Sequence, residues 1–277
     1  MKVYSIYFFP NFNFLFIYII PMNNNEKSIN IISDNDNLGE FEEHSQPTVQ
    51  LVFGGCGGMY NYSLGVASII QKHFTLGSNV IISGASAGCF PAILSTLNMD
   101  IDDLFESWDI PFLREINSFK FGALCKWNKV VRKWIEPQLD EDSYQRANSR
   151  FYCSLTSIPS FTNHIVSNWK NNQDLVDGIL ASSFLPIFDI GKLTANFRGR
   201  RYIDGSFTNS YPLPLGDKTP SFIIKRNMWR ENNLSWLWCW SDEAWARKLF
   251  NWGKEDALNH IEEISSIFNP STIMELL

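Results

Sequence analysis

Ser86 stands between two glycines in the run Gly84-Ala85-Ser86-Ala87-Gly88. The run fits the G-x-S-x-G pattern, in which a sharp turn from a strand into a helix exposes a serine hydroxyl. Glycines flank the serine because backbone and side chains crowd such a turn. A strained serine at a helix N-terminus suits attack on a carbonyl, since the helix dipole favours the negative charge that develops. The alternative is a glycine-rich turn of some other doubly wound fold.

A second glycine-rich run, Gly54 to Gly58, lies ahead of the serine. Clustered glycines let successive amides point at one anion, because no Cβ blocks the approach. The run lacks the Lys of a phosphate-binding P-loop and the last glycine of a dinucleotide fingerprint. In acyl transfer such a loop would form an oxyanion hole. The candidate donors are the amides of Gly55, Cys56, Gly57 and Gly58.

Asp204 is the candidate proton acceptor for the serine, because it follows a hydrophobic strand end and precedes a glycine. A carboxylate with an ordinary pKa near 3.9 is a weak base. Asp204 can serve only if burial raises its pKa or if the proton moves as the tetrahedral intermediate forms. The alternative is an aspartate that caps a turn. None of the histidines has the loop context of a catalytic base, and His164 is expected to be packed within a strand. The four histidines are His44, His73, His164 and His260.

The elements that must position these residues alternate between strand and helix. Short apolar runs predict strands before each glycine-rich turn, and helical spacing follows both turns. Further strands are expected in the second half of the chain. This order predicts an α/β fold with parallel strands and helices on both faces of the sheet. The predicted strands are 48–53, 79–83, 150–157, 162–167, 202–203 and 221–225.

The composition of the 277 residues excludes several classes of protein. With 45% apolar and 19% charged residues, the chain is not disordered throughout. A net charge of −6 without a long basic run disfavours nucleic-acid binding. Five widely spaced cysteines form no C-x-x-C pair, which gives no support to a metal site and is typical of a cytosolic compartment.

Both ends of the chain differ from the middle. Residues 1–46 comprise a hydrophobic segment and a polar lead-in expected to be flexible. The uncharged stretch Val3–Pro21 is either an anchor or uncleaved signal or, if translation starts at Met22, not part of the protein. Residues 227–277 are Trp-rich and predict a helical stripe that ends at Gly253 and packs on the domain. The alternative is that these Trp residues contact a lipid interface.

Together these features resemble the patatin-like phospholipase family, and most closely its animal-type neutral-lipid lipases. The stretch from Gly55 to Ala67 fits the family's G-C-G-F-L-G-x-Y-x-x-G-V-A without a gap, and Ser86 falls in its G-x-S-A-G elbow. Asp204 falls in the family's D-G-[GA] motif. Two further matches are Asn209 with Pro212 (N-x-P) and Ala181 to Pro186 (A-S-x-A-x-P). Three residues depart from the pattern: Met59, Tyr60 and Ser206. Many members have a basic residue at the position of Met59. Glycine is usual at the position of Tyr60, where a side chain is expected to crowd the loop.

The resemblance implies a three-layer α/β/α fold with a central, mostly parallel sheet, within a catalytic domain at residues 47–226. It also implies a lipid acyl hydrolase that cleaves glycerolipid esters with a Ser86–Asp204 dyad, through an acyl-serine intermediate and without a metal or other cofactor. The expected partners are a glycerolipid and a membrane or lipid-droplet surface, with no nucleic acid. The expected location is cytoplasmic and peripheral to membranes. The basic residues Arg198, Arg200 and Arg201 are either phosphate contacts or an exposed hairpin edge.

Two other functions fit the same residues. A catalytically silent lipid-binding or scaffolding protein could have this fold, because Tyr60 and the irregular glycine loop depart from the pattern. An acyltransferase would use the same serine with an acceptor other than water.

Overall fold

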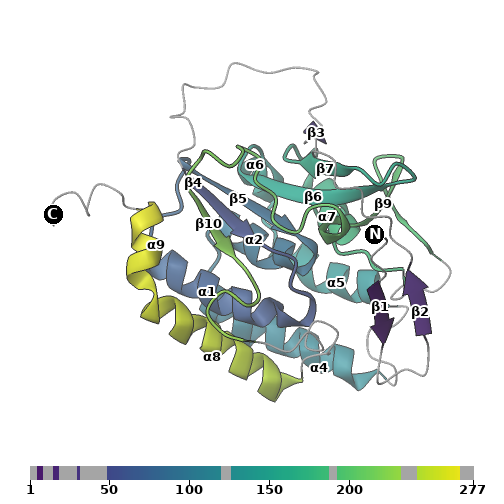
Figure 1. The fold of residues 1–277 in the computed structure, drawn as a ribbon. Helices are drawn as coiled ribbons and strands as arrows, with labels where there is room; N and C mark the ends of the chain where they lie inside the picture. The colour runs from purple at the N-terminus through teal and green to yellow at the C-terminus, as the bar shows by residue number, and fades with distance from the viewer. Residues whose placement is uncertain are drawn as a thin grey trace.

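The computed structural model describes residues 49–119, 126–186, 192–231 and 242–268, together with the backbone of three short strands nearer the N-terminus. An 8-stranded sheet forms the centre of this part of the chain (Figure 1). Its strands are β3 (Asn30–Ile31), β4 (Val49–Phe53), β5 (Val80–Ala85), β6 (Phe151–Ile158), β7 (Asn163–Val166), β8 (Ala195–Phe197), β9 (Arg200–Asp204) and β10 (Ser221–Ile224).

The strand order places the two glycine-rich turns next to each other. The main path is β10-β4-β5-β6-β7-β3, in which β10, β4, β5 and β6 run parallel. Strand β6 pairs antiparallel with β7 and with β9, which brings Asp204 opposite Leu155. Because parallel strands end at the same edge, the turns after β4 and β5 lie side by side. Every position of β4 and β5 is buried, as expected for parallel strands covered on both faces.

Helices flank the mostly parallel sheet, which confirms the predicted three-layer α/β/α fold. The α-helices are α1 (Tyr60–His73), α2 (Cys89–Thr96), α3 (Ile101–Leu104), α4 (Ile110–Ser118), α5 (Trp127–Ile135), α6 (Ser143–Ala147), α7 (Asn172–Ser182), α8 (Glu243–Asn259) and α9 (Ile261–Phe268). The 3-10 turns are η1 (Gly57–Met59), η2 (Ser86–Gly88), η4 (Glu136–Gln138) and η5 (Gly205–Phe207), and η3 (Phe105–Asp109) is a π-helical turn.

Helix α8 lies along α1, and the two backbones touch at glycines (Figure 1). A Cβ on Gly253 would lie 2.1 Å from the carbonyl oxygen of Tyr62, and one on Gly65 would lie 2.1 Å from that of Phe250. The prediction that Gly253 ends the C-terminal helix is therefore wrong, because α8 continues to Asn259. Gly253 is required for close packing instead of for termination.

Three of the clustered Trp residues pack against the core. Trp229 contacts Phe222 and stacks on His260, while Trp245 and Trp252 meet edge to face. All three Trp side chains are partly buried. These contacts favour the core interpretation for this part of the cluster. Leu237 and the Trp residues at 236, 238 and 240 lie outside the described residues.

The N-terminal segments form strands where they are described. Strand β1 (Ser5–Phe8) pairs antiparallel with β2 (Leu15–Tyr18), and β3 of the polar lead-in pairs with β7. Within the described residues, the structure contains no helix with the length and apolarity needed to cross a bilayer.

Candidate active site

Ser86 occupies the turn between β5 and α2 with a φ of 56°, in the left-handed region that non-glycine residues rarely adopt. The flanking glycines allow this turn. A Cβ on Gly84 would lie 2.8 Å from the Cα of Cys89, and one on Gly88 would lie 2.5 Å from the carbonyl oxygens of Phe53 and Gly54. The G-x-S-x-G pattern is thus explained by sterics, with the strain concentrated at the serine.

The side chains of Ser86 and Asp204 meet at the edge of the sheet. The Ser86 hydroxyl donates to Oδ2 of Asp204 at 2.5 Å, although the two residues are 118 positions apart. The other carboxylate oxygen, Oδ1, accepts the backbone N–H of Ser206 at 2.8 Å. Asp204 therefore makes the turn-capping contact considered above and the contact to the serine at the same time.

Burial determines the protonation of Asp204. Only 4% of the residue is exposed, and this burial raises the pKa of its carboxyl from 3.8 to about 6. The hydrogen bonds from Ser86 and Ser206 oppose the rise by stabilising the charged form. An aspartate with this pKa can hold a proton briefly near neutral pH, which a general base must do.

The end of α7 supports both members of the pair. The backbone N–H of Ser86 donates to the Ser182 hydroxyl at 3.0 Å, and Ser182 donates to the Ser154 carbonyl at 2.7 Å. The N–H of Asp204 donates to the carbonyl of Phe184 at 2.9 Å. Ser182 was predicted only as part of a motif. Its contact with the nucleophile comes from a partner 96 positions away, which local sequence does not reveal.

A polar network beneath Asp204 was also not predicted. The Thr156 hydroxyl donates to the carbonyl oxygen of Asp204 at 2.8 Å and shares a 2.8 Å bond with Thr208. The amide of Asn163 donates to the hydroxyl of Ser154 at 2.7 Å. Asn209, which was predicted from the N-x-P element, joins this network through its carbonyl oxygen, which accepts from Ser154 at 3.2 Å. The network fixes the turn that carries Asp204.

The glycine loop lies beside the pair. The N–H of Gly55 donates to the Ser210 carbonyl at 3.2 Å, whereas the amides of Cys56 and Gly57 donate to no carbonyl of the described residues. Gly57 has a φ of 50°, which favours glycine. Burial raises the pKa of the Cys56 thiol to about 12, so the thiol stays neutral near neutral pH.

The three departures from the family pattern take different environments. Met59 is buried in the core. The hydroxyl of Tyr60 reaches Asp109 and its ring contacts Phe90, so this side chain is directed into the core. Ser206 lies against the loop, since a Cβ on Gly55 would lie 2.0 Å from its Oγ.

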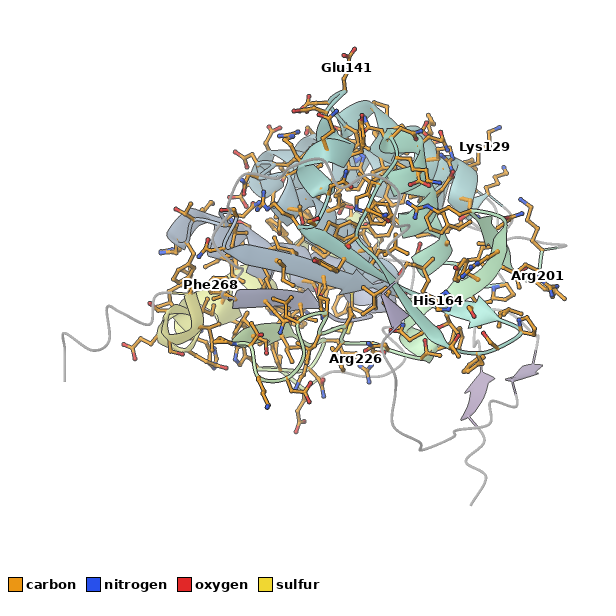
Figure 2. The ribbon with its side chains drawn as sticks, turned by 90° about the horizontal axis from the view of Figure 1, so that it is seen from above. Lys129, Glu141, His164, Arg201, Arg226 and Phe268 are labelled. Atoms are coloured by element: carbon orange, nitrogen blue, oxygen red, sulfur yellow. The ribbon has the colours of Figure 1, made fainter. Side chains whose placement is uncertain are left out.

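The histidines and arginines considered above lie elsewhere. In the described chain no histidine hydrogen-bonds to Ser86. His164 shares a 3.1 Å bond with the hydroxyl of Tyr202 in the sheet, and burial lowers the pKa of its imidazole. Figure 2 shows His164 on the same side of the molecule as Arg201. His73 is exposed, His260 contacts Trp229, and His44 lies outside the described residues.

The three arginines belong to the β8–β9 hairpin. The side chain of Arg198 is half-buried and pairs with Asp174, whose Oδ1 accepts from its Nε at 3.0 Å. Arg200 and Arg201 are exposed on the strand that follows. Arg200 and Arg201 thus lie on an exposed hairpin edge, whereas Arg198 is held by Asp174.

Comparison with known proteins agrees with this geometry. Residues 51–216 match the family model for patatin-like phospholipases. Human patatin-like phospholipase domain-containing protein 4 is 32% identical over 178 residues, which cover 61% of this chain and 68% of that protein. Mouse omega-hydroxyceramide transacylase is 28% identical over 58% of this chain, and the match spans only 27% of the transacylase.

Among solved structures, VipD from Legionella pneumophila aligns with a TM-score of 0.40 and 14% identity, over 64% of this chain and 49% of that one. This likeness is too weak to carry a conclusion. The family match, in contrast, covers more than half of the chain and includes the elbow, the glycine loop and the aspartate turn. The chain belongs to the patatin-like phospholipase family.

Proposed function

We propose that this protein cleaves acyl ester bonds of glycerolipids, with Ser86 as the nucleophile and Asp204 as its proton acceptor. The observation that carries the proposal is the 2.5 Å bond between Ser86 Oγ and Asp204 Oδ2. This bond ends on a serine held at a φ of 56° between two sterically required glycines. A strained, hydrogen-bonded serine at a strand-to-helix turn is the arrangement that acyl transfer uses.

In the first step, Ser86 Oγ attacks the ester carbonyl and its proton moves to Oδ2 of Asp204. The negative charge on the former carbonyl oxygen needs fixed donors. The amides of Cys56 and Gly57 are the best candidates in the glycine loop, because Gly55 already donates to Ser210. Each such donor contributes about 3–4 kcal/mol to transition-state stabilisation in acyl transfer.

In the second step, the tetrahedral intermediate collapses and Asp204 returns its proton to the departing alkoxide of the lipid. This leaves an acyl-Ser86 ester and an ionised Asp204. Asp204 then takes a proton from water as the water attacks the acyl group, and the serine regains its hydroxyl. The raised pKa of Asp204, about 6, suits this alternation between its two protonation states.

Transfer to an alcohol is the second candidate function. It needs the same steps with an alcohol in place of water. The similarity to a protein named omega-hydroxyceramide transacylase supports this second candidate. Incubating the enzyme with a labelled glycerolipid and a long-chain alcohol separates the two. Free fatty acid as the main product supports hydrolysis, and a new ester of the alcohol supports transfer.

We also propose that residues 47–226 are the catalytic domain, that residues 227–277 extend it, and that the protein works at a lipid surface. The contact of α8 with α1 supports an extension that belongs to the same core. A cytoplasmic, peripheral location is part of this proposal. Sedimentation with triacylglycerol emulsions and phospholipid vesicles tests it, with an excess in the pellet over a lipid-free control as the expected result.

The dyad itself is tested by covalent labelling. A fluorophosphonate probe should label the parent protein and the exposed-serine control Ser266→Ala, and should not label Ser86→Ala. Esterase activity on a short-chain acyl ester should follow the same pattern, with all three proteins equally folded by circular dichroism. Labelling and activity that persist in Ser86→Ala would assign the chemistry to another residue, and absence of both in the parent would favour a silent lipid-binding protein.

A further inference from the structure

A second buried carboxylate lies outside the proposed dyad. Asp109 ends the π-helical turn η3 and has no exposed surface. Its Oδ1 accepts from the hydroxyl of Tyr60 at 2.5 Å, and its Oδ2 accepts from the side-chain amide of Asn61 at 2.5 Å. In the described part of the chain these are its side-chain contacts, and neither is a cation. Burying an unpaired carboxylate is costly, so its presence calls for an explanation.

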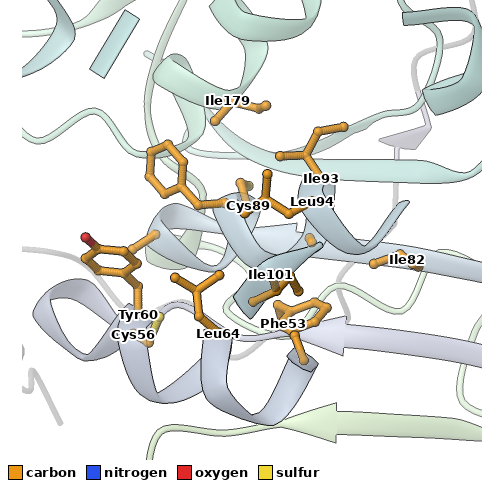
Figure 3. Packing of buried hydrophobic residues seen from close by; sticks show 14 of the residues in the cluster. Phe53, Cys56, Tyr60, Leu64, Ile82, Cys89, Ile93, Leu94, Ile101 and Ile179 are labelled. Carbon is orange, nitrogen blue, oxygen red and sulfur yellow. The ribbon is translucent and has the colours of Figure 1, made fainter. Parts of the chain in front are cut away.

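Both donors belong to the first turn of α1, directly after the glycine loop. The loop and this turn are tied together, because the backbone N–H of Tyr60 donates to the carbonyl of Gly57. Figure 3 shows Tyr60 beside Cys56 at the start of α1, with its hydroxyl directed away from Cys56. A shift of Tyr60 would therefore also displace the amides of Cys56 and Gly57 in the adjacent loop.

Tyr60 also touches the helix that follows the serine. Its ring packs on Phe90 of α2, with centroids 6.4 Å apart. Helix α2 begins three residues after Ser86. The Tyr60 side chain, which binds Asp109, thus lies between α1 and α2. Its packing there sets the position of the glycine loop relative to Ser86.

Asn61 and the π-helical turn point to a specific use of the carboxylate. The Asn61 side chain has an orphaned Oδ1, which is buried and has no hydrogen-bond partner among the described residues. Asn61 therefore acts through the hydrogen bond that its side-chain NH2 group donates to Asp109. The turn that ends at Asp109 has i→i+5 geometry, a rare feature that occurs frequently at functional sites.

We propose that Asp109 is a positioning residue for acyl transfer, which fixes the glycine loop relative to Ser86 through Tyr60 and Asn61. This inference rests on the proposed function, since it assumes that the amides of Cys56 and Gly57 bind the oxyanion. Such donors must be held within about 0.5 Å of the productive geometry. Loss of one donor lowers kcat about 10²–10³-fold in acyl transfer, so a partly displaced loop is expected to cost about tenfold.

The ionised form of Asp109 is the one that matches its partners, because both partners donate. Burial raises the pKa of its carboxyl to about 7. The titratable group that contacts it, the Tyr60 phenol, stays neutral near this pH, since burial raises its pKa well above the usual value. Charged side chains on the surrounding elements pair with one another at the surface: Glu106 with Arg247, Arg114 with Glu243, and Lys133 with Glu115.

Tyr60→Phe is the decisive variant, with Tyr62→Phe as its matched control. Tyr62 lies on the same helix and donates to a buried aspartate, Asp256, at 2.9 Å, but it faces α8. On a soluble acyl ester, Tyr60→Phe should lower kcat about tenfold and leave KM within about twofold, because only transition-state contacts weaken. Tyr62→Phe should leave both constants within about twofold, even where its thermal midpoint falls.

The pH profile gives a second measurement on the carboxylate itself. The kcat of the parent should rise through two ionisations, near pH 6 from Asp204 and near pH 7 from Asp109. Asp109→Asn should lose the second ionisation and keep the first. If this variant fails to fold, Tyr60→Phe still decides the matter.

Parent values of kcat in Tyr60→Phe, or a profile in Asp109→Asn identical to that of the parent, would overturn the positioning role. An equal loss of kcat in Tyr60→Phe and Tyr62→Phe would do the same. A fluorophosphonate signal that survives in Ser86→Ala would instead overturn the proposed function, so the two failures are distinguishable.

Discussion

Two buried aspartates, one at the proposed active site and one between α1 and α8, have opposite kinds of partner. Asp256 on α8 accepts two hydrogen bonds from the guanidinium of Arg230, at 2.7 and 2.9 Å, and one from the hydroxyl of Tyr62 at 2.9 Å. Asp204 is equally enclosed but receives its bonds from neutral groups, the Ser86 hydroxyl and the Ser206 amide. Among the residues that the structure describes, Asp256 has a compensating cation and Asp204 does not.

We interpret this difference as one between a structural carboxylate and the proposed catalytic one. A carboxylate paired with a guanidinium holds two elements together. An unpaired buried carboxylate has a raised pKa, which costs stability and lets it accept a proton during a reaction. Asp204 is of the second kind, with a pKa raised to about 6 by burial. Cation pairing therefore distinguishes the proposed catalytic aspartate from the aspartate at the helix contact.

Exchanging each carboxylate for an amide should break the comparison most clearly. Asp204→Asn should lower kcat on an acyl ester about 10³-fold or more, because the amide cannot take the proton of Ser86. Asp256→Asn should leave kcat within about twofold per folded molecule. Steady-state kinetics with active-site titration measure both. A comparable loss of kcat in the two variants would show that enclosure alone, and not the lack of a cation, marks the functional residue.

A second contrast between the helix contact and the proposed active site concerns stability, and it is tested at Gly253. Gly253→Ala should destabilise the protein by about 3 kcal/mol, because its Cβ would lie 2.1 Å from the backbone oxygen of Tyr62. The kcat of the molecules that remain folded should not change, since this contact lies outside the proposed site. Urea unfolding measures the loss.

The matched control is Gly77→Ala, where the nearest neighbour is the end of the Asn79 side chain at 3.2 Å. That variant should lie within about 0.5 kcal/mol of the parent. Equal stability of Gly253→Ala and Gly77→Ala would mean that α1 and α8 separate at little cost.

Sequence was informative where one short segment carries its own physical requirement. The elbow around Ser86 needs small residues at fixed positions, and the observed clash distances at Gly84 and Gly88 show why. The strand runs and the parallel order could also be predicted, because β4 and β5 each contain three consecutive large apolar residues, 51–53 and 80–82. Asp204 could be predicted as a candidate because a strand end followed by glycine places the side chain at the sheet edge.

Sequence was uninformative where the requirement comes from a distant partner. Gly253 has the local properties of a helix terminator, but contact with α1 determines its role. Asp109 offers no local signal at all, since its meaning depends on Tyr60, 49 positions earlier. Ser182 is similar, because its hydroxyl accepts from the amide of Ser86 across the sheet edge.

The ion pair at the helix contact should have a moderate effect on stability. Arg230→Gln should lower the free energy of unfolding by about 1–2 kcal/mol, because Asp256 would lose its cation while the exposed part of the pair remains screened by water. Urea unfolding of Arg230→Gln, Asp256→Asn and the double variant measures their coupling. Strictly additive losses would mean that the pair contributes nothing beyond its separate residues, and would weaken the contrast with Asp204.

The smallest expected effect is the pH dependence of stability that Asp204 contributes. Its pKa is about 6 in the folded protein and near 3.8 in the unfolded chain, so the folded state binds more protons between these values. The contribution of Asp204 to stability is therefore largest below about pH 4 and is lost as the pH rises through 6. Between pH 5 and pH 7 the parent should lose about 1 kcal/mol of stability relative to Asp204→Asn, which has no carboxyl to ionise at this position.

Comparing the two proteins cancels the contribution of Asp109, whose titration has the same sign and is present in both. Urea unfolding at the two pH values measures it. A parent that gains stability over Asp204→Asn as the pH rises would mean that Asp204 has a compensating partner after all, and the contrast with Asp256 would disappear.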